Sequence, residues 1–262
     1  MSEIVWEGHN AAAWRDRLRV PAVHLYETIG STNDVARDLA EAGAASLTTV
    51  IADHQTAGRG RGGRSWLSTP GSSLLCSVVF RATEGAAAAP GATPVRLGYA
   101  VARAIADVAH VDARVKWPND VVIPGHGKVA GILCESVMRQ SSTFVVGGIG
   151  VNVRAPGGEF ASLNEISERD LGRGDLFEQI LANIRTFSGS LTDPLTIDEL
   201  DAFQELDILF GQDVEDDTGV AGVASGVDPD GSLLVQTSKG MIAVHSATIR
   251  LAGSHQYPGA RI

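Results

Sequence analysis

Two spacings of apolar residues run along this chain, one typical of strands and one typical of helices. Apolar and β-branched residues crowd into strand-like runs at residues 23–28, 48–53, 72–80, 128–137 and 143–153. Apolar residues recur at helical spacing in residues 11–19, 31–43, 94–110, 175–190 and 196–210. Strands and helices intermix, and a short polar segment joins the two longest strand-like runs. We therefore predict an α+β fold whose mixed sheet has these two runs at its centre.

Polar residues mark the expected starts of three helices. Ser31 or Thr32, Asp175 and Thr196 each precede a helical pattern, and their side-chain oxygens can accept a free backbone N–H of the first turn. Within residues 113–123, Pro118 favours an extended residue before it and interrupts strand pairing there.

The pattern changes at Gly211. From there to the end, short apolar runs alternate with D-P-D-G and K-G turns at residues 228–231 and 239–240, a texture typical of a small SH3-like barrel. We predict two domains, a larger one at residues 1–210 and a C-terminal β domain at residues 211–262.

Charge and cysteine content narrow the functional classes. The formal net charge is −10, and a general nucleic-acid binder would normally carry a basic face. Cys76 and Cys134 each lie inside an apolar run, as expected of free thiols in a reducing compartment. The first ten residues lack a signal-peptide pattern, and no apolar stretch is long enough to cross a membrane. We expect a cytoplasmic protein that does not bind membranes.

The segment His54–Trp66 combines four glycines with three arginines, between two strand-like runs. Glycines let backbone N–H groups approach a ligand closely, and arginines present fork-shaped donors to phosphate or carboxylate. No Asp or Glu occurs between Asp53 and Glu84, so we expect nothing nearby to neutralise these cations. A solvated surface loop and an RGG-type nucleic-acid contact are alternatives, whereas the Walker pattern of a P-loop is absent. We predict an anion-binding loop of an active site.

Further polar clusters interrupt the apolar runs: Gly30–Asn33, Gln55, Lys116–Asp120, Lys128 with Gly131, and Asn152. Each has a plain structural interpretation by itself, as a helix cap, a turn or a solvated lysine. Their combination in one chain is more informative than any one of them by itself.

Taken together, these segments resemble the biotin protein ligase family. The similarity rests on five segments in the family's order: GSTN (30–33), GRGRGGRSW (58–66), KWPND (116–120), GKVAGILCE (127–135) and GIGVN (148–152). It covers roughly residues 22–153, and the C-terminal module is similar in kind only. Gly62 and Ser65 depart from residues common in the family's loop. The resemblance implies a catalytic domain of the class II synthetase-like, biotin/lipoate ligase type.

The resemblance also implies a reaction in two steps. Biotin and ATP first give biotinyl-5′-AMP and pyrophosphate, and a lysine of a biotin carboxyl carrier protein then takes the biotinyl group. ATP and Mg²⁺ are the expected cofactors, and biotin and the carrier are the expected partners.

Roles follow residue by residue. The two anions that meet in the first step need cations beside them, and Lys128 and Arg61 are the catalytic candidates. The residues expected at biotin are Ser31, Thr32, Asn33, Gln55, Gly58, Arg59, Gly60, Arg61, Lys128 and Gly131. The residues expected at ATP are Arg61, Trp66, Asn119, Asp120, Lys128 and Asn152. Asp120 is a candidate for reaching Mg²⁺ through water.

Two alternative functions remain: a lipoate- or octanoate-type ligase or acyltransferase of the same fold, and a non-catalytic biotin-binding regulator. Only about 20 residues precede the first predicted long strand, too few for the DNA-binding domain of some family members, so we expect no DNA binding. We expect a monomer or a weak homodimer.

Overall fold

The computed structural model describes residues 3–82, 89, 91–139, 142–154, 161–187 and 190–251. Its helices are α1 (Ala11–Leu18), α2 (Thr32–Glu41), α3 (Ala92–Ala109), α4 (Leu163–Ser167), α5 (Arg173–Ile184) and α6 (Ile197–Leu206), and Arg61–Gly63 form a 3₁₀ turn. A short hairpin of β1 (Val5–Trp6) and β2 (His9–Asn10) precedes α1. The hairpin and α4 are elements that the apolar pattern did not predict.

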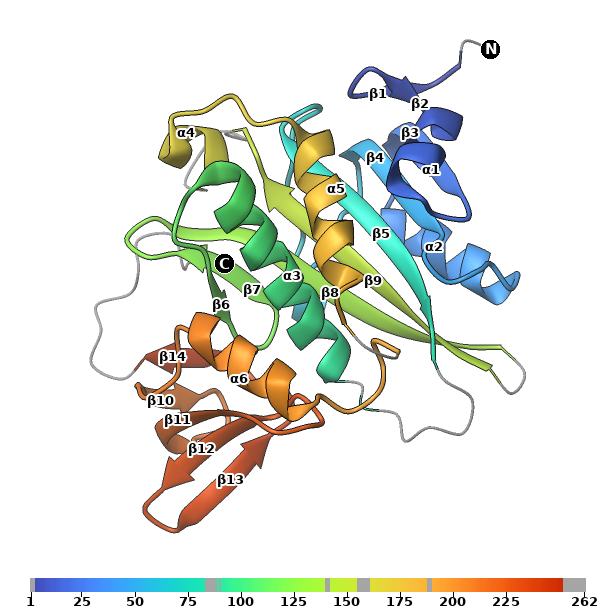
Figure 1. Ribbon diagram of the computed structural model, residues 1–262. Helices are drawn as coiled ribbons and strands as arrows, with labels where there is room; N and C mark the ends of the chain where they lie inside the picture. The colour runs from blue at the N-terminus through green and yellow to red at the C-terminus, as the bar shows by residue number, and fades with distance from the viewer. Residues whose placement is uncertain are drawn as a thin grey trace.

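A seven-stranded mixed sheet forms the larger part of the molecule (Figure 1). Its strands, in spatial order, are β3 (Val23–Ile29), β4 (Thr49–Gln55), β5 (Ser73–Arg81), β9 (Ser142–Asn152), β8 (Gly127–Arg139), β7 (Asp120–Ile123) and β6 (Arg114–Lys116). Only β3 and β4 pair in parallel. The predicted α+β class is confirmed, and β8 and β9 lie side by side in the interior of the sheet, as their long apolar runs indicated.

Helices cover both faces of this sheet. Successive strand residues point to opposite faces, so Val50 packs in one apolar cluster with Ala36 and Ala40 of α2, whereas Ile51 packs in the cluster that contains α3 and α5. Figure 1 shows α3 and α5 side by side across one face. Each of these helices buries one face, so its apolar residues recur with the helical period. This recurrence explains why the helices could be predicted from the sequence.

The C-terminal residues form a five-stranded antiparallel sheet. Its spatial order is β13 (Gly240–Val244), β12 (Leu233–Thr237), β11 (Ala221–Val227), β10 (Asp213–Asp216) and β14 (Ile249–Leu251). Four of these strands match predicted runs, and β14 was not predicted. The buried Trp117 indole donates to Gly231 O at 2.9 Å, which ties this sheet to the larger one. Residues 252–262 of the predicted C-terminal domain lie outside the described residues.

Helix α6 confirms one predicted cap and corrects another. Thr196 Oγ1 accepts from Glu199 N, and the Glu199 side chain accepts from Thr196 N, which completes a capping box. The predicted cap at Asp175 is wrong: α5 begins after Gly172, and Asp175 lies in its first turn, paired with Arg17.

Both helices also end before the predicted residues 190 and 210. After α6 the chain turns to pair with β6, where Ile208 N donates to Val115 O at 3.0 Å, so the backbone groups that would continue the helix are used elsewhere. None of the helices in the described ranges is long and apolar enough to cross a membrane.

Arg96 fastens α6 to α3 from inside the protein. Its side chain is 1% exposed and uses all its N–H groups, forming a bidentate pair with Glu199 at 2.7 and 2.9 Å and donating to the carbonyls of Leu191, Asp193 and Pro194. These five hydrogen bonds satisfy every guanidinium donor, as the burial of such a polar group requires.

Arg96→Met should therefore destabilise the fold strongly, since it leaves a mostly buried carboxylate and three carbonyls without their donor. Removing one partner of such a pair costs about 3–5 kcal/mol, measurable as a lower urea midpoint. Arg15→Met is the control, because Arg15 pairs with Asp16 at the surface and should change the midpoint little. Equal midpoints for the two variants would contradict the structural role of Arg96.

Asp207 is a second charged group buried at this junction. Its Oδ1 accepts from Leu209 N at 3.0 Å, and its Oδ2 is buried without a hydrogen-bond partner among the described residues. Burial raises the pKa of this carboxyl from its ordinary value of 3.8 to about 6.

Asp207 should make the protein less stable as the pH rises. Below about pH 3.8 both states hold the proton, and between that pH and about 6 only the unfolded state releases it, so stability falls across this window and is then level. Asp207→Asn removes the titration and should be more stable than the natural chain above pH 6, by roughly 1–3 kcal/mol. Urea midpoints of both proteins across this range test it: a constant difference between them would refute the assignment.

Candidate active site

One cavity of about 640 Å³ collects nearly all the predicted site residues. It lies against the sheet beside the N-terminus of α2, and the loop after β4 closes over it. The predicted residues that line it are Ser31, Thr32, Asn33, Gln55, Arg59, Gly60, Arg61, Trp66, Asn119, Asp120, Lys128, Gly131 and Asn152. Gly58 is the exception. Segments far apart in the sequence thus form one concave surface of the size that small-molecule sites have.

The floor of the cavity is a part of the sheet without side chains. A Cβ at Gly150 would lie 2.7 Å from the Trp66 ring, one at Gly148 would overlap the Asn33 amide, and one at Gly131 would lie 3.1 Å from Lys128 Nζ. Gly131 was predicted, whereas Gly148 and Gly150 were missed. Their signal was available, since glycines inside a strand often mark a close approach by another group.

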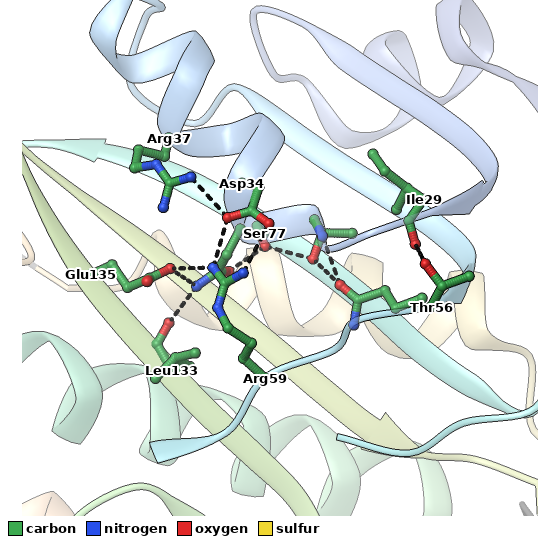
Figure 2. A network of polar contacts seen from close by, with 11 residues as sticks. Ile29, Asp34, Arg37, Thr56, Arg59, Ser77, Leu133 and Glu135 are labelled. Carbon is green, nitrogen blue, oxygen red and sulfur yellow. Dashed lines mark hydrogen bonds and ion pairs between the residues drawn. The ribbon is translucent and has the colours of Figure 1, made fainter. Parts of the chain in front are cut away.

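The end of the cavity next to α2 carries neutral hydrogen-bonding groups, and their network continues to the charged side chains of Asp34, Arg59 and Glu135, which Figure 2 shows. Gln55 Oε1 accepts from Thr32 N at 2.7 Å and from Thr32 Oγ1 at 2.9 Å. Ser77 Oγ donates to Asn33 Oδ1 at 2.6 Å and lies 2.8 Å from Thr32 Oγ1. Because its oxygen is occupied, Gln55 has its amide N–H groups left for a ligand.

Arg59 adjoins this neutral end, and its charge is compensated there. Its guanidinium makes a bidentate pair with Asp34 at 2.8 and 2.9 Å and reaches Glu135 at 3.4 Å. The hydrogen bonds with Arg59 lower the pKa of Asp34, and those with Asp34 raise the pKa of Arg59. The expectation that nothing neutralises the loop arginines is therefore wrong for Arg59, because the fold brings carboxylates from α2 and β8 to it.

The loop itself is a closed hairpin. Trp66 N donates to Gly58 O at 2.9 Å and Gly60 N to Arg64 O at 2.7 Å, while Gly62 and Gly63 have φ of 65° and 77°. Those angles suit glycine best. Gly58 lies at the base of this hairpin, where a Cβ would be 2.7 Å from Trp66 O, which explains why it does not line the cavity.

The other end of the cavity gathers cations. Lys128 Nζ lies 2.7 Å from Asp120 Oδ1 and 5.7 Å from the centre of the Trp66 ring. Lys116 borders the same space, and burial lowers its pKa. Burial also lowers the pKa of Arg61. Cations that are partly desolvated attract anions more strongly than solvated ones do, so this end suits phosphate and carboxylate groups.

Arg61 is held from two sides. Nη1 donates to Asn119 Oδ1 at 3.2 Å, and Nη2 donates to Ser246 Oγ at 2.7 Å. Asn119 is fixed in turn, since its Nδ2 donates to Ile132 O at 3.0 Å. Asp217 also borders the cavity and raises the pKa of Arg61 in opposition to burial. The C-terminal residues at the cavity were missed, because no sequence pattern singled them out.

Trp66 and Asn152 also line the cavity. The indole Nε1 of Trp66 is buried without a hydrogen-bond partner in the part of the chain that the structure describes, so it is a donor left for a ligand. Asn152 is buried, and its Oδ1 accepts from Ser73 Oγ at 3.5 Å.

The donor set fits a magnesium ion only together with a phosphate ligand. Among the described residues no group of three His, Cys, Asp or Glu side chains is placed to hold a metal ion. Asp120 and Asp217 are carboxylates at the cationic end, and Asp120 is the one paired with Lys128. Proteins usually bind Mg²⁺ through one or two carboxylates, and substrate phosphates supply further ligands. Asp120 fits that arrangement.

Comparison with known proteins identifies the family to which the chain is similar. Residues 25–152 match the Biotin/lipoate A/B protein ligase family, and residues 213–251 match the Biotin protein ligase C terminal domain. The Bifunctional ligase/repressor BirA of Bacillus subtilis is 30% identical over 250 residues, which cover 90% of this chain and 76% of that protein. The biotin–[acetyl-CoA-carboxylase] ligase of Mycobacterium tuberculosis is 40% identical over 128 residues, which cover 47% of this chain and 46% of that protein.

A solved structure agrees with these matches. The biotin protein ligase of Aquifex aeolicus in complex with biotin and ATP superposes with a TM-score of 0.73 at 24% identity, covering 88% of this chain and 99% of that one, and shows that the fold is shared. With the extended match to the Bacillus subtilis protein and the two family domains in order, the chain belongs to the biotin protein ligase family.

Proposed function

We propose that this protein attaches biotin, at the expense of ATP, to a lysine of a biotin carboxyl carrier protein through biotinyl-5′-AMP. The observation that carries the proposal is a single cavity with a neutral hydrogen-bonding end and a cationic end. Biotin has the same polarity, with a neutral ureido ring at one end and a carboxylate at the other. The similar biotin–[acetyl-CoA-carboxylase] ligase of Mycobacterium tuberculosis and the Aquifex aeolicus complex with biotin and ATP agree with this substrate pair.

Biotin binds with its ring at the neutral end. Thr32 and Gln55 supply an ordered set of donors and acceptors, and Ser31 is buried beside them. The backbone of Arg59 and Gly60 borders the ring, and Gly131 lets the ligand lie against the sheet. The carboxylate then points towards Lys128.

In the first step a biotin carboxylate oxygen attacks the α-phosphorus of ATP. The new P–O bond forms as the bond to the β-phosphate oxygen breaks, and pyrophosphate leaves with the electron pair. Lys128 neutralises the two approaching anions, and Arg61 holds the phosphate. In the free protein Lys128 is paired with Asp120, so substrate anions replace a carboxylate that already keeps the ammonium in place.

Mg²⁺, when bound with ATP, supplies positive charge to the leaving pyrophosphate. Asp120 would hold it, directly or through water. Trp66, Asn119 and Asn152 border the nucleotide and orient it.

In the second step the amine of the carrier lysine attacks the biotinyl carbonyl carbon. The C–O bond to the phosphate breaks, AMP leaves, and the proton of the amine passes to solvent.

We further propose a catalytic domain at residues 1–210 and a closing domain at residues 211–262, in a cytoplasmic protein that acts as a monomer or weak homodimer. The free state of Cys76 and Cys134 supports the reducing compartment.

A lipoate- or octanoate-type ligase is the alternative to exclude. Those acids lack the ureido group, so they would leave the Thr32 and Gln55 donors and acceptors without partners, and sites built on hydrogen bonds discriminate strongly against such analogues. Pyrophosphate release measured with biotin, lipoate and octanoate separates the functions. Release with biotin alone supports the proposal, and release with the other acids alone, or with none, refutes it.

Lys128→Ala should abolish most adenylate formation. Loss of one preorganised charge at a reacting oxyanion costs about 3 kcal/mol or more, which is at least a hundredfold in rate. The assay is the single-turnover rate of pyrophosphate release. Lys239→Ala, which removes an exposed lysine from the β12–β13 turn, is the control and should keep the natural rate. A rate for Lys128→Ala within about threefold of the control would remove Lys128 from the mechanism.

Arg61→Gly should release the adenylate sooner while leaving biotin recognition nearly intact. Arg61 contacts Asn119 and Ser246 at the nucleotide end, whereas biotin recognition rests on Thr32 and Gln55. An adenylate that escapes acylates other amines, because the mixed anhydride is already activated. We therefore expect biotin on bystander proteins mixed with the variant.

The measurement compares the half-life of bound adenylate with the biotin Kd, using Arg250→Ala, which changes an exposed residue of β14, as the control. A biotin Kd that rises as steeply as adenylate retention falls would place Arg61 at the ring instead.

A further inference from the structure

We propose that Asp34 and Glu135 are positioning and specificity-determining residues of this site: they hold Arg59 in place and cancel its charge beside the neutral end of the cavity. The inference rests on the proposed function and assigns a role to two carboxylates that do not themselves need to touch biotin. We call this pair of carboxylates with Arg59 the latch.

The latch has the geometry of a specific contact. Arg59 Nη1 donates to Asp34 Oδ2 and Nη2 to Asp34 Oδ1, so the fork of the guanidinium meets both carboxylate oxygens. The same Nη2 lies 3.4 Å from Glu135 Oε2. Figure 2 shows the guanidinium between Asp34, which comes from α2, and Glu135, which comes from β8.

The carboxylates are themselves held by the scaffold. Asn33 Nδ2 donates to Glu135 Oε2 at 2.6 Å, and the same amide accepts from Ser77 on β5. Asn33 is only 3% exposed. Asp34 lies in the first turn of α2, where the helix dipole favours a negative charge. The loop is thereby fastened to three rigid elements through one side chain.

The latch matters because of the backbone around it. Arg59 stands between Gly58 and Gly60, whose own conformational preferences are weak. With the side chain fixed, the backbone of Arg59 and Gly60 keeps its position at the cavity, where the proposed function places biotin.

The latch also decides which anions this end accepts. An uncompensated Arg59 would put a positive charge beside the donors for the ureido ring and attract phosphate to the wrong end of the cavity. Asp34 and Glu135 together offset the charges of Arg59 and Arg37, so this end has no excess positive charge. ATP phosphates and the biotin carboxylate therefore both select the end with Lys128 and Arg61.

Three variants test the latch: Asp34→Asn, Glu135→Gln and the double substitution. Biotin binding by calorimetry should weaken about tenfold in the double variant, as expected for lost charge-assisted hydrogen bonds. Inhibition of adenylate formation by inorganic phosphate should strengthen, while the KM for ATP stays within about twofold. The latch side chains are about a third exposed, so folding depends little on them, and urea midpoints should barely move.

Arg37→Gln is the matched control, because Arg37 also pairs with Asp34, at 2.9 Å, but does not border the cavity. Its biotin Kd should match the natural chain. In an Arg59→Ala background, Asp34→Asn should have no further effect on biotin Kd, since the contact it removes is already gone.

Natural biotin affinity in the double variant, additive effects with Arg59→Ala, or equal losses for biotin and ATP would each overturn the latch. If the natural chain itself binds no biotin, the proposed function fails instead, and the two failures are distinguishable from one titration.

Discussion

The site depends on a strip of sheet surface that has no side chains. Gly131, Gly148 and Gly150 lie on the two strands at the middle of the sheet, and the space over them is taken by the Trp66 ring and the Asn33 amide. Any Cβ there would push these groups outward and, with them, the loop and the start of α2. The cavity therefore depends on glycines in two adjacent interior strands, which leave room above the sheet.

The second constraint is electrostatic. A chain with a net charge of −10 places Arg61, Lys116 and Lys128 around one space. Burial lowers the pKa of Arg61 and of Lys116, which shows that the fold holds them against their preference for water. Asp120 and Ser246 keep the cations in place in the free protein. The charge of Arg59, in contrast, is offset by Asp34 and Glu135. The same loop therefore contributes both to the neutral end and to the cationic end of the cavity.

The smaller sheet belongs to this site as well. Trp117, within the turn that leads to Asn119 and Asp120, is buried against Gly231, and Ser246 reaches Arg61. The smaller sheet thus supports both the turn that carries Asn119 and Asp120 and the arginine that pairs with Asn119. These contacts explain physically how residues of the C-terminal domain complete the wall of the cavity.

The sequence by itself determined most of the helices and strands and the set of candidate site residues. Strands and helices were readable because apolar spacing reports which face of an element is buried, and the capping box at Thr196 and Glu199 is a local interaction. The resemblance to the ligase family predicts that Lys128, Arg61, Thr32 and Gln55 share one site, and all four line the same cavity.

Only the tertiary structure decided how charges pair and where helices end. Arg59 is neutralised by carboxylates 25 and 76 residues away, Arg61 is held by a serine 185 residues away, and α6 stops where Ile208 pairs with β6. Gly58 supports the loop from outside the cavity for a similar reason, because its neighbour is the Trp66 backbone. These outcomes depend on which distant segments of the chain contact each other in the folded protein. Hydrophobic periodicity shows which face of an element is buried, but it does not show which segment packs against that face.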